Sequence, residues 1–335
     1  MIWKQKNDIH YGMVDVLRLV FAIAVVSIHT MAFKSVNDDL WIATSMGIAR
    51  LAVPFFFMVS GYFLYNRIAS EKEPKSTIKH LLRIYFLWVL IEIIALFPLV
   101  LSSLSAPPIL IIERLLFAGV TGSLWYISSL IITIFIISPL LKRDKLFFLF
   151  IIGFVLYLFG TTGDTYYGLF EKTMINPLIN GYTSVFMLPQ VGITESILFV
   201  SLGAIVSKYK LNEKIQKSGL LSIFSIILLL IEAFVLNKTG IAKDANMYLS
   251  SIIAAPLILI WAINSTKNIS TKVSKACREY SLGIYCSHQI VMIWLAMFIP
   301  VLFANTLLRF ICSLLLSALI ITILRKTKIR KILLR

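Results

Sequence analysis

Charge is scarce in this sequence, and acidic charge is scarcer still. Only 14% of the residues are Asp, Glu, Lys or Arg, and 16 acidic side chains stand against 32 basic ones. This composition excludes an ordinary soluble domain, in which about 25% of residues are charged. With 59% hydrophobic residues and a mean hydropathy of +0.89, the chain is typical of a protein that crosses a membrane several times.

Cysteine and the common catalytic signatures are also sparse or missing. None of the three cysteines, Cys277, Cys286 and Cys312, falls in a predicted outer loop, which argues against a disulfide framework. The sequence has no HExxH, CxxC, P-loop or GxSxG motif, and its four histidines are too scattered to indicate a zinc site. We therefore expect no metal. The first apolar segment is long and lacks a cleavage pattern, so a cleavable signal peptide is not predicted.

Ten apolar stretches divide the chain, most of them near the length of about 20 residues that a membrane-spanning helix needs. They cover residues 14–33, 43–66, 80–101, 123–141, 146–160, 194–207, 219–236, 247–264, 282–302 and 306–324. We predict an all-α, polytopic membrane protein with about ten transmembrane helices. Residues 1–335 are expected to form a single membrane domain with no soluble domain.

The basic residues fall on alternate connections between these stretches. If the amino terminus is cytoplasmic, the inner connections and the two ends carry 23 Lys and Arg residues, whereas the outer connections carry five. This positive-inside distribution predicts that both termini are cytoplasmic, including the basic tail 325–335. The net charge of +16 is thus a topological signal, which favours the lipid bilayer over nucleic acid as the partner. We expect a multi-pass protein of a bacterial cell membrane and leave open whether it forms a homodimer.

One apolar stretch, DVLRLVFAIAVVSIH, holds Asp15 and Arg18 at one end and His29 at the other. At about 100° per residue, the eleven steps from Arg18 to His29 return to within roughly 20° of the same direction, about 16 Å further along the helix. Ionisable residues inside a membrane normally face a protein interior or a water-filled cavity. We interpret this helix as one wall of a reaction or transport path. In the absence of a metal or serine nucleophile, His29 is the natural general base.

Further polar residues lie within the predicted spans. Arg50 sits in the outer half of the second span, where it could come close in depth to His29; a snorkelling side chain is the alternative. Ser281, Tyr285 and His288 follow i, i+4, i+7 spacing and therefore share one face of the ninth span. Two intramembrane histidines on separate helices, with an arginine nearby, favour a functional site over two satisfied core residues.

Three other residues predict local features of the spans. Pro54 should kink the second span, and Gly61 should allow another backbone to approach closely. Glu92, near the middle of the third span, must be protonated, paired or hydrated.

The ends of the spans supply the remaining candidates. Trp125 and Tyr126 in SLWYISSL suit either an aromatic belt or a substrate contact. Asp164 and Tyr166 belong to TTGDTYYG in the longest outer segment, which is either an acceptor platform or a solvated connector. At the inner face, Arg83 is either interfacial or a ligand for phosphate.

Four of these segments resemble the integral-membrane enzymes of acyltransferase family 3. The family's first-span signature, an arginine and a histidine separated by ten residues, corresponds to Arg18 and His29. The segments RLAVPFFFMVSGYFL, SLWYISSL and SLGIYCSH resemble its second, fourth and late motifs in the same order. The resemblance covers nearly the whole chain. It implies O-acyl transfer from cytosolic acyl-CoA, usually acetyl-CoA, to a hydroxyl of an extracytoplasmic glycan, lipid-linked sugar or small molecule.

The resemblance also implies a division of roles. Arg18 and His29 would be the catalytic pair, with Arg18 and Arg83 holding the CoA phosphates through charge-assisted hydrogen bonds. Tyr285 and His288 would contact the donor as well. The expected acceptor-binding residues are Arg50, Trp125, Tyr126, Asp164 and Tyr166. Whether His29 acts only as a base or briefly carries the acyl group is left open.

A second resemblance supports a different hypothesis. AVPFFFMVSGY and GTTGDTYYGL are similar to the membrane half of vancomycin-resistance serine racemases, where this kind of domain is fused to a racemase and is thought to supply serine from outside. This chain ends at Arg335 without such a domain, which we expect to be a departure from that plan. The alternative function is therefore a transporter of a small hydroxylated solute such as L-serine, although we see no internal repeat of the kind common in transporters.

Overall fold

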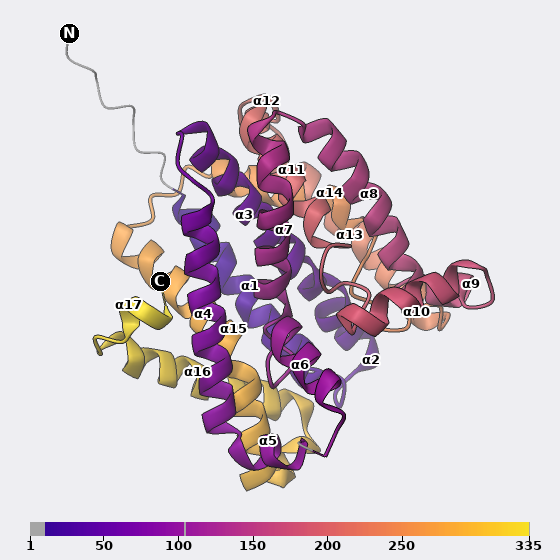
Figure 1. Cartoon of the computed structure of the whole chain (residues 1–335), viewed down its shortest axis with the longest axis vertical. Coiled ribbons are helices and arrows are strands. Elements are labelled where there is room, and N and C mark those ends of the chain that lie inside the picture. The colour runs from indigo at the N-terminus through magenta and orange to yellow at the C-terminus, as the bar shows by residue number, and fades with distance from the viewer. Residues whose placement is uncertain (1–10, 104, 335) are drawn as a thin grey trace.

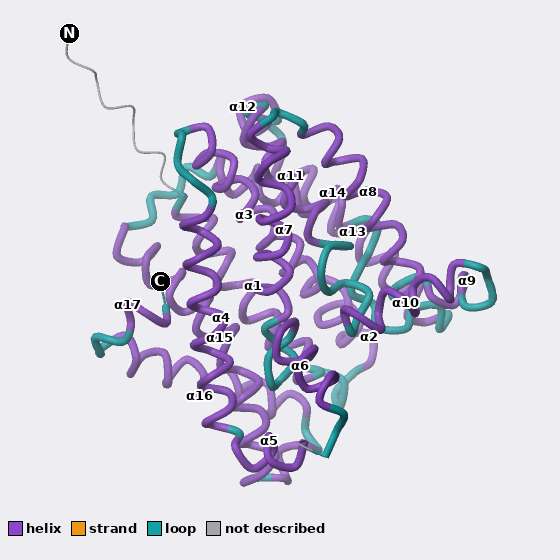
Figure 2. Tube along the Cα trace, viewed as in Figure 1, coloured by secondary structure: helices purple, strands orange, loops and turns teal. Residues whose placement is uncertain are grey.

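The computed structural model describes residues 11–103 and 105–334, and every regular element in this part of the chain is helical (Figures 1 and 2). The elements are α1 (Gly12–Thr30), α2 (Asp38–Trp41), η1 (Ile42–Gly47), η2 (Ile48–Leu51), α3 (Ala52–Ala69), α4 (Lys75–Ala95), α5 (Phe97–Ser103), α6 (Pro108–Phe117), α7 (Trp125–Lys142), α8 (Leu146–Gly163), α9 (Tyr167–Phe170), α10 (Ile175–Phe186), α11 (Ser196–Lys208), α12 (Leu211–Lys214), α13 (Ser218–Lys238), α14 (Ser251–Asn264), α15 (Thr271–Phe298), η3 (Pro300–Phe303), α16 (Thr306–Arg325) and α17 (Arg330–Leu333).

All ten predicted apolar stretches contain a helix, which confirms an all-α, polytopic membrane protein. Among the described residues, seven helical segments are long and apolar enough to cross a membrane. They are α1, the run Asp38–Ala69, α7, α8, α13, α15 and α16. Of the other three predicted spans, α11 and α14 are apolar but short, and α4 carries charged residues along its length. The number ten and the cytoplasmic termini therefore stay predictions.

Two helix pairs form the centre of the bundle: α1 packs along α15, and α3 packs along α11. Next to them, α16 flanks α15 and α8 flanks α11. In Figure 1, α4 and α16 lie on one side of α1, and α8, α13 and α14 on the other. The outer helices present large apolar side chains, such as Phe135, Phe147 and Leu315, each more than 60% exposed. An apolar surface of this extent suits lipid and not water.

Glycines allow α3 and α11 to touch backbone to backbone. A Cβ atom at Gly61 would lie 2.0 Å from the carbonyl oxygen of Val200, and one at Gly203 would lie 2.0 Å from the carbonyl oxygen of Met58. Small residues at such crossings let helices in a membrane approach closely. The close approach predicted at Gly61 is confirmed, and α11 is the partner.

The predicted kink at Pro54 takes the form of a change in helix type. The chain runs as a π-helix through η1 and as a 3-10 helix through η2 before α3 begins, so Pro54 lies in the first turn of α3. A proline ring clashes with the carbonyl group four residues earlier, which here belongs to Arg50. The irregular segment is therefore the one that carries Arg50.

Ion pairs join residues of the predicted inner connections to one another at one end of the bundle. Glu73 pairs with Lys142 at 2.8 Å, and Asp144 pairs with Lys208. Near the ends of the described chain, Asp15 bonds Arg278 and Glu279 bonds Arg325. The start of α1 and the end of α16 thus lie at the same end of the bundle, which we call the basic face.

Glu92 is fully buried, and a loop satisfies its carboxylate. Oε2 accepts a hydrogen bond from the backbone N–H of Val120 at 2.7 Å, and Oε1 accepts one from the Thr121 hydroxyl at 2.6 Å. Of the three predicted alternatives, protonated, paired or hydrated, the structure shows a carboxylate paired with hydrogen-bond donors of a loop. This pairing fixes the loop before α7, which supplies residues to the site described next.

Candidate active site

Two cavities share Tyr285 as a lining residue. The first, of about 720 Å³, opens among Arg18, Tyr126 and Arg278; we call it the basic cavity. The second, of about 270 Å³, is lined by His29 and Arg50, and we call it the histidine cavity. Arg18 and His29, which line one cavity each, are eleven residues apart on α1 and therefore about 16 Å apart along that helix, so the cavities extend to different depths.

Tyr285 forms part of the wall between the cavities. It is 5% exposed, and its hydroxyl donates a hydrogen bond to the carbonyl oxygen of Ser123 in the loop held by Glu92. Its ring packs edge-on against Tyr126, with the ring centroids 5.8 Å apart. A phenol held at both its ring and its hydroxyl has little freedom to move without displacing these neighbours.

A single buried carboxylate organises the wall of the basic cavity. Asp15 is 2% exposed, and both of its carboxylate oxygens accept hydrogen bonds. Oδ1 accepts one from Arg18 at 3.1 Å. Oδ2 accepts one from Arg278 at 2.8 Å and another from the Ser274 hydroxyl. The Ser281 hydroxyl donates to the backbone carbonyl of Arg18 at 2.9 Å, which ties α1 to α15 at the same level. Two guanidinium groups are thereby fixed side by side.

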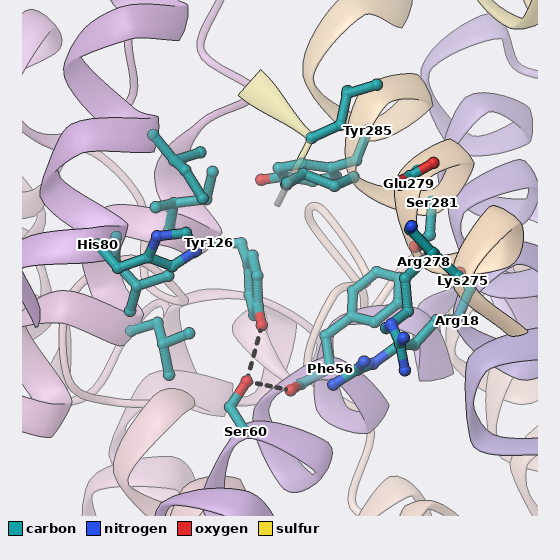
Figure 3. A pocket seen from close by; sticks show the side chains of 16 residues that line it. Arg18, Phe56, Ser60, His80, Tyr126, Lys275, Arg278, Glu279, Ser281 and Tyr285 are labelled. Carbon is teal, nitrogen blue, oxygen red and sulfur yellow. Dashed lines mark hydrogen bonds between the residues drawn. The ribbon is translucent and has the colours of Figure 1, made fainter. Parts of the chain in front are cut away.

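Positive charge exceeds negative charge around this cavity. Glu279 pairs with Arg325 at 2.9 Å and with Arg330 at 3.3 Å. The wall and its immediate neighbours thus hold five basic side chains against two carboxylates: Arg18, Lys275, Arg278, Arg325 and Arg330 against Asp15 and Glu279. Figure 3 shows Arg18, Lys275 and Arg278 together on one side, across from His80 and Tyr126. Such a surplus suits an anionic ligand, and guanidinium groups suit phosphate in particular.

Most of the remaining lining of the basic cavity is apolar. Phe56, Ile127, Leu130 and Leu282 line it. The only hydrogen bonds drawn in Figure 3 join Ser60 to the Tyr126 hydroxyl, at 3.2 Å, and to the carbonyl of Phe56, at 2.8 Å. A cavity with a basic side and an apolar remainder fits a ligand that carries both phosphate groups and an apolar chain.

His29 lies at the end of α1, beside two residues of α15. Its Nδ1 is 2.8 Å from the side-chain nitrogen of Gln289, and its ring centroid is 5.1 Å from that of His288. His288 is 1% exposed, and its Nδ1 donates to the carbonyl of Tyr285 at 2.7 Å, while its Nε2 meets no hydrogen-bond partner among the described residues. His288 lines neither cavity, so the structure connects it to the site through His29.

Arg50 turns into the histidine cavity. Its guanidinium donates to the side-chain oxygen of Asn246 and, at 3.3 Å, to the carbonyl of Asp244. The snorkelling alternative therefore does not describe this side chain. Trp125 lines the same cavity, whereas its neighbour Tyr126 lines the basic cavity. The two aromatics predicted as an aromatic belt or as substrate contacts thus belong to different cavities.

Asp164 and Tyr166 stand behind the site. Asp164 is fully buried and accepts four hydrogen bonds, from the Thr165 hydroxyl, both nitrogens of Asn246 and the backbone N–H of Met247. Tyr166 donates to Glu232 at 2.6 Å. Neither lines the cavities, so the structure gives no support to their prediction as acceptor contacts. Asp164 instead braces the loop that positions Asn246 against Arg50.

Arg83 is likewise outside the basic cavity. It is exposed on α4, and its guanidinium lies 3.0 Å from Nδ1 of His80, which does line the cavity. Lys275 and Arg278 were not predicted from the sequence, although they take the place expected for Arg83. Arg278 lies seven positions before Tyr285 and so on the same helical stripe, a signal that was read only as topology. Gln289, Glu195 and Asp244 were not predicted either, because no motif marks them.

Comparison with known proteins gives the chain its family. The family model of the acyltransferase domain matches residues 12–326. An amino-acid racemase of Enterococcus faecalis is 28% identical over 95% of this chain and 47% of its own length. A serine/alanine racemase of Enterococcus gallinarum is 33% identical over 74% of this chain and 37% of its own length. The chain thus spans less than half of these relatives, and no solved structure matches it.

These findings confirm both resemblances drawn from the motifs, to acyltransferase family 3 and to the serine racemases. The match over residues 12–326 takes in every helix from α1 to α16 and all the residues that line the two cavities except Leu334. The chain belongs to the acyltransferase domain family.

Proposed function

We propose that this protein transfers an acyl group, acetyl in the simplest case, from acyl-CoA in the basic cavity to a hydroxyl in the histidine cavity. The basic face would then be cytosolic, in line with the positive-inside distribution, and the protein would lie in a bacterial cell membrane. The observation that carries the proposal is the shared wall: a basic cavity and a histidine-lined cavity meet at one tyrosine.

The basic cavity suits the donor in both charge and shape. Arg18 and Arg278, held in place by Asp15, would bind phosphate groups through charge-assisted hydrogen bonds. The apolar part of the cavity would hold the thin thioester arm, with its reactive carbonyl directed toward Tyr285. These residues would bind and orient the donor and keep bulk water from the thioester.

His29 would act on the acceptor. It would remove the proton from the acceptor hydroxyl while the hydroxyl oxygen forms a bond to the thioester carbonyl carbon. The carbon–sulfur bond then breaks, and His29 returns the proton to the departing sulfur, so that an ester and CoA are the products. General-base assistance of this kind typically contributes about 10²–10⁴ in rate.

Gln289 would be a positioning residue for His29. A neutral imidazole can accept a proton at Nε2 only if its own proton is on Nδ1, and Nδ1–H needs an acceptor. The Gln289 amide lies 2.8 Å from Nδ1, and a half-turn of the amide puts its oxygen at that place. With the oxygen there, Gln289 fixes the tautomer that leaves Nε2 free for the acceptor.

The test uses purified protein in lipid nanodiscs, with acetyl-CoA binding and slow acetyl-CoA hydrolysis as the two readouts. The expected result is saturable binding that Arg18→Ala weakens about tenfold or more, together with a His29→Ala variant that binds acetyl-CoA but does not turn it over. Full turnover by His29→Ala would refute the role of this residue. Absence of acyl-CoA binding by the wild type would refute the proposal as a whole.

One observation favours a second candidate, transport of a small hydroxylated solute such as L-serine. Both cavities reach Tyr285, so a movement that displaces this side chain together with its neighbours would join them into a path, and a relative is named serine/alanine racemase. Uptake of labelled L-serine into proteoliposomes, with no binding of any acyl-CoA, would support this candidate against the first.

A further inference from the structure

The histidine cavity contains buried polar atoms that the described residues leave without hydrogen bonds. Oε2 of Glu195 and Oε1 of Gln190 are acceptors without a donor, and Nε of Arg50 is a donor without an acceptor. Glu195 is 1% exposed and Gln190 is 4% exposed, and all three residues line the cavity. An unpaired buried polar group costs about 1–3 kcal/mol, so three at one cavity indicate that something else binds there.

Glu195 is the most informative of the three. It is the residue before α11, and no hydrogen bond or ion pair reaches either carboxylate oxygen from the described part of the chain. Arg50 lines the same cavity, but its Nη atoms donate hydrogen bonds to the Asn246 side chain and to the carbonyl of Asp244. The charge of Arg50 acts on Glu195 without forming an ion pair with it. A buried carboxylate that accepts no hydrogen bond is costly, which makes a cationic ligand that donates hydrogen bonds a natural partner.

The charges of the cavity wall point the same way. Among the described residues, Arg50 is the one Arg or Lys that lines it, whereas the acidic residues Glu195 and Asp244 both line it. Behind the wall, Asp164 adds a third carboxylate, although its oxygens are occupied by loop N–H groups. The two free carboxylates and the orphaned Gln190 oxygen together form a surface that accepts hydrogen bonds from a positively charged donor.

We propose that Glu195, Gln190 and Asp244 form an ammonium subsite, so that the acceptor is a small molecule that carries a primary amine beside its hydroxyl. The ammonium group would satisfy the orphaned oxygens while the hydroxyl faces His29, and an oxygen of the acceptor would satisfy Nε of Arg50. The volume of about 270 Å³ suits an amino alcohol, a hydroxylated amino acid or an amino sugar. It lies below the range of about 300–1,000 Å³ that is usual for drug-sized ligands.

The inference rests on the proposed function only for the fate of the hydroxyl, because the ammonium contact itself requires no acyl transfer. Binding is therefore measured on the full chain in nanodiscs without any acyl-CoA. The probes are tritiated 2-aminoethanol, L-serine and glucosamine, followed by scintillation proximity. Each is displaced by its own unlabelled form or by the partner in which a hydroxyl replaces the amine: 1,2-ethanediol, glycerate and glucose.

We expect at least one amine to bind about tenfold or more tightly than its hydroxyl partner. Glu195→Gln should remove that preference while keeping the shape of the side chain. Asp244→Asn is the second variant, because this side chain is exposed and its replacement does not threaten the fold. The matched control is Glu171→Gln, an exposed carboxylate outside both cavities, which should keep the preference.

Three outcomes would overturn the inference. The first is that no amine binds more tightly than its hydroxyl partner. The second is that Glu195→Gln and Asp244→Asn, shown by gel filtration and thermal melting to be folded, keep the full preference for the amine. The third is that sodium-22 binds in a Glu195-dependent manner while no amine binds, which would assign the carboxylate to an inorganic cation. None of these bears on acetyl-CoA binding, whose loss would refute only the proposed function.

Discussion

Replacing Arg18 with glutamine should weaken acyl-CoA binding without unfolding the protein. Asp15 loses one of its partners, but it keeps Arg278 at 2.8 Å and the Ser274 hydroxyl, so no buried carboxylate is left unpaired. What disappears is one charge-assisted hydrogen bond to the donor, worth about 1.5–3 kcal/mol. At about 1.4 kcal/mol per tenfold change, the Kd for acetyl-CoA should rise roughly ten- to hundredfold.

The assay is acetyl-CoA binding to the nanodisc-embedded protein at two salt concentrations. Arg143→Gln is the matched control: it removes an exposed arginine from the same face of the bundle and should leave the Kd within about twofold of wild type. The wild-type Kd should also weaken as salt rises, because salt screens the charges that bind phosphate. If Arg83→Gln weakened binding as much as Arg18→Gln, the donor would bind on the exposed face of α4, outside the basic cavity, and the assignment of that cavity would be refuted.

Three more predictions concern other parts of the site and the fold. Gln289→Leu should lower kcat about tenfold or more with an unchanged Kd for acetyl-CoA, since only the tautomer of His29 is affected; an equal rise in Kd would show a structural role instead. Tyr285→Ala should raise the ratio of acetyl-CoA hydrolysis to acyl transfer in product analysis, because water gains access through the shared wall; an unchanged ratio would argue against that wall. Gly203→Ala should lower the melting temperature in detergent, because overpacking should reduce the free energy of unfolding by about 1–3 kcal/mol. Gly181→Ala is the control and should leave the melting temperature unchanged, because a Cβ there meets nothing within 4 Å. Equal melting temperatures of the two variants would contradict the close crossing.

The fold was largely accessible from the sequence because its main determinants act locally. A continuous apolar stretch must form a helix in lipid, since no water satisfies its backbone there. The contacts of Gly61 and Glu92 could also be predicted. A small residue in a span allows another helix to pack closely, and a carboxylate there needs a partner. Pro54 correctly indicated an irregular helix, although the irregularity lies in the turns before Pro54, which carry Arg50.

The candidate site was accessible only where its residues share one helix. The stripe that joins Arg18 to His29 is a property of α1, and the stripe with Tyr285 is a property of α15. Asp164 and Asn246, by contrast, are 82 residues apart in the sequence and meet only in the tertiary fold. Asp164 was therefore predicted to contact substrate, whereas in the structure it braces a loop. Glu195 and Gln190 carry no sequence pattern, because what marks them is the lack of a hydrogen-bond partner in the folded protein.

The reciprocal glycine contacts between α3 and α11 limit how this protein can move. Each helix presents a carbonyl oxygen to the surface where the other lacks a side chain, at Gly61 with Val200 and at Gly203 with Met58. Sliding by one residue would drive a Cβ into a carbonyl group, so the pair resists shear and should travel as one body. Any opening that admits substrate must therefore come from hinges elsewhere, and the irregular turns of η1 and η2, which precede α3 directly, offer the nearest one.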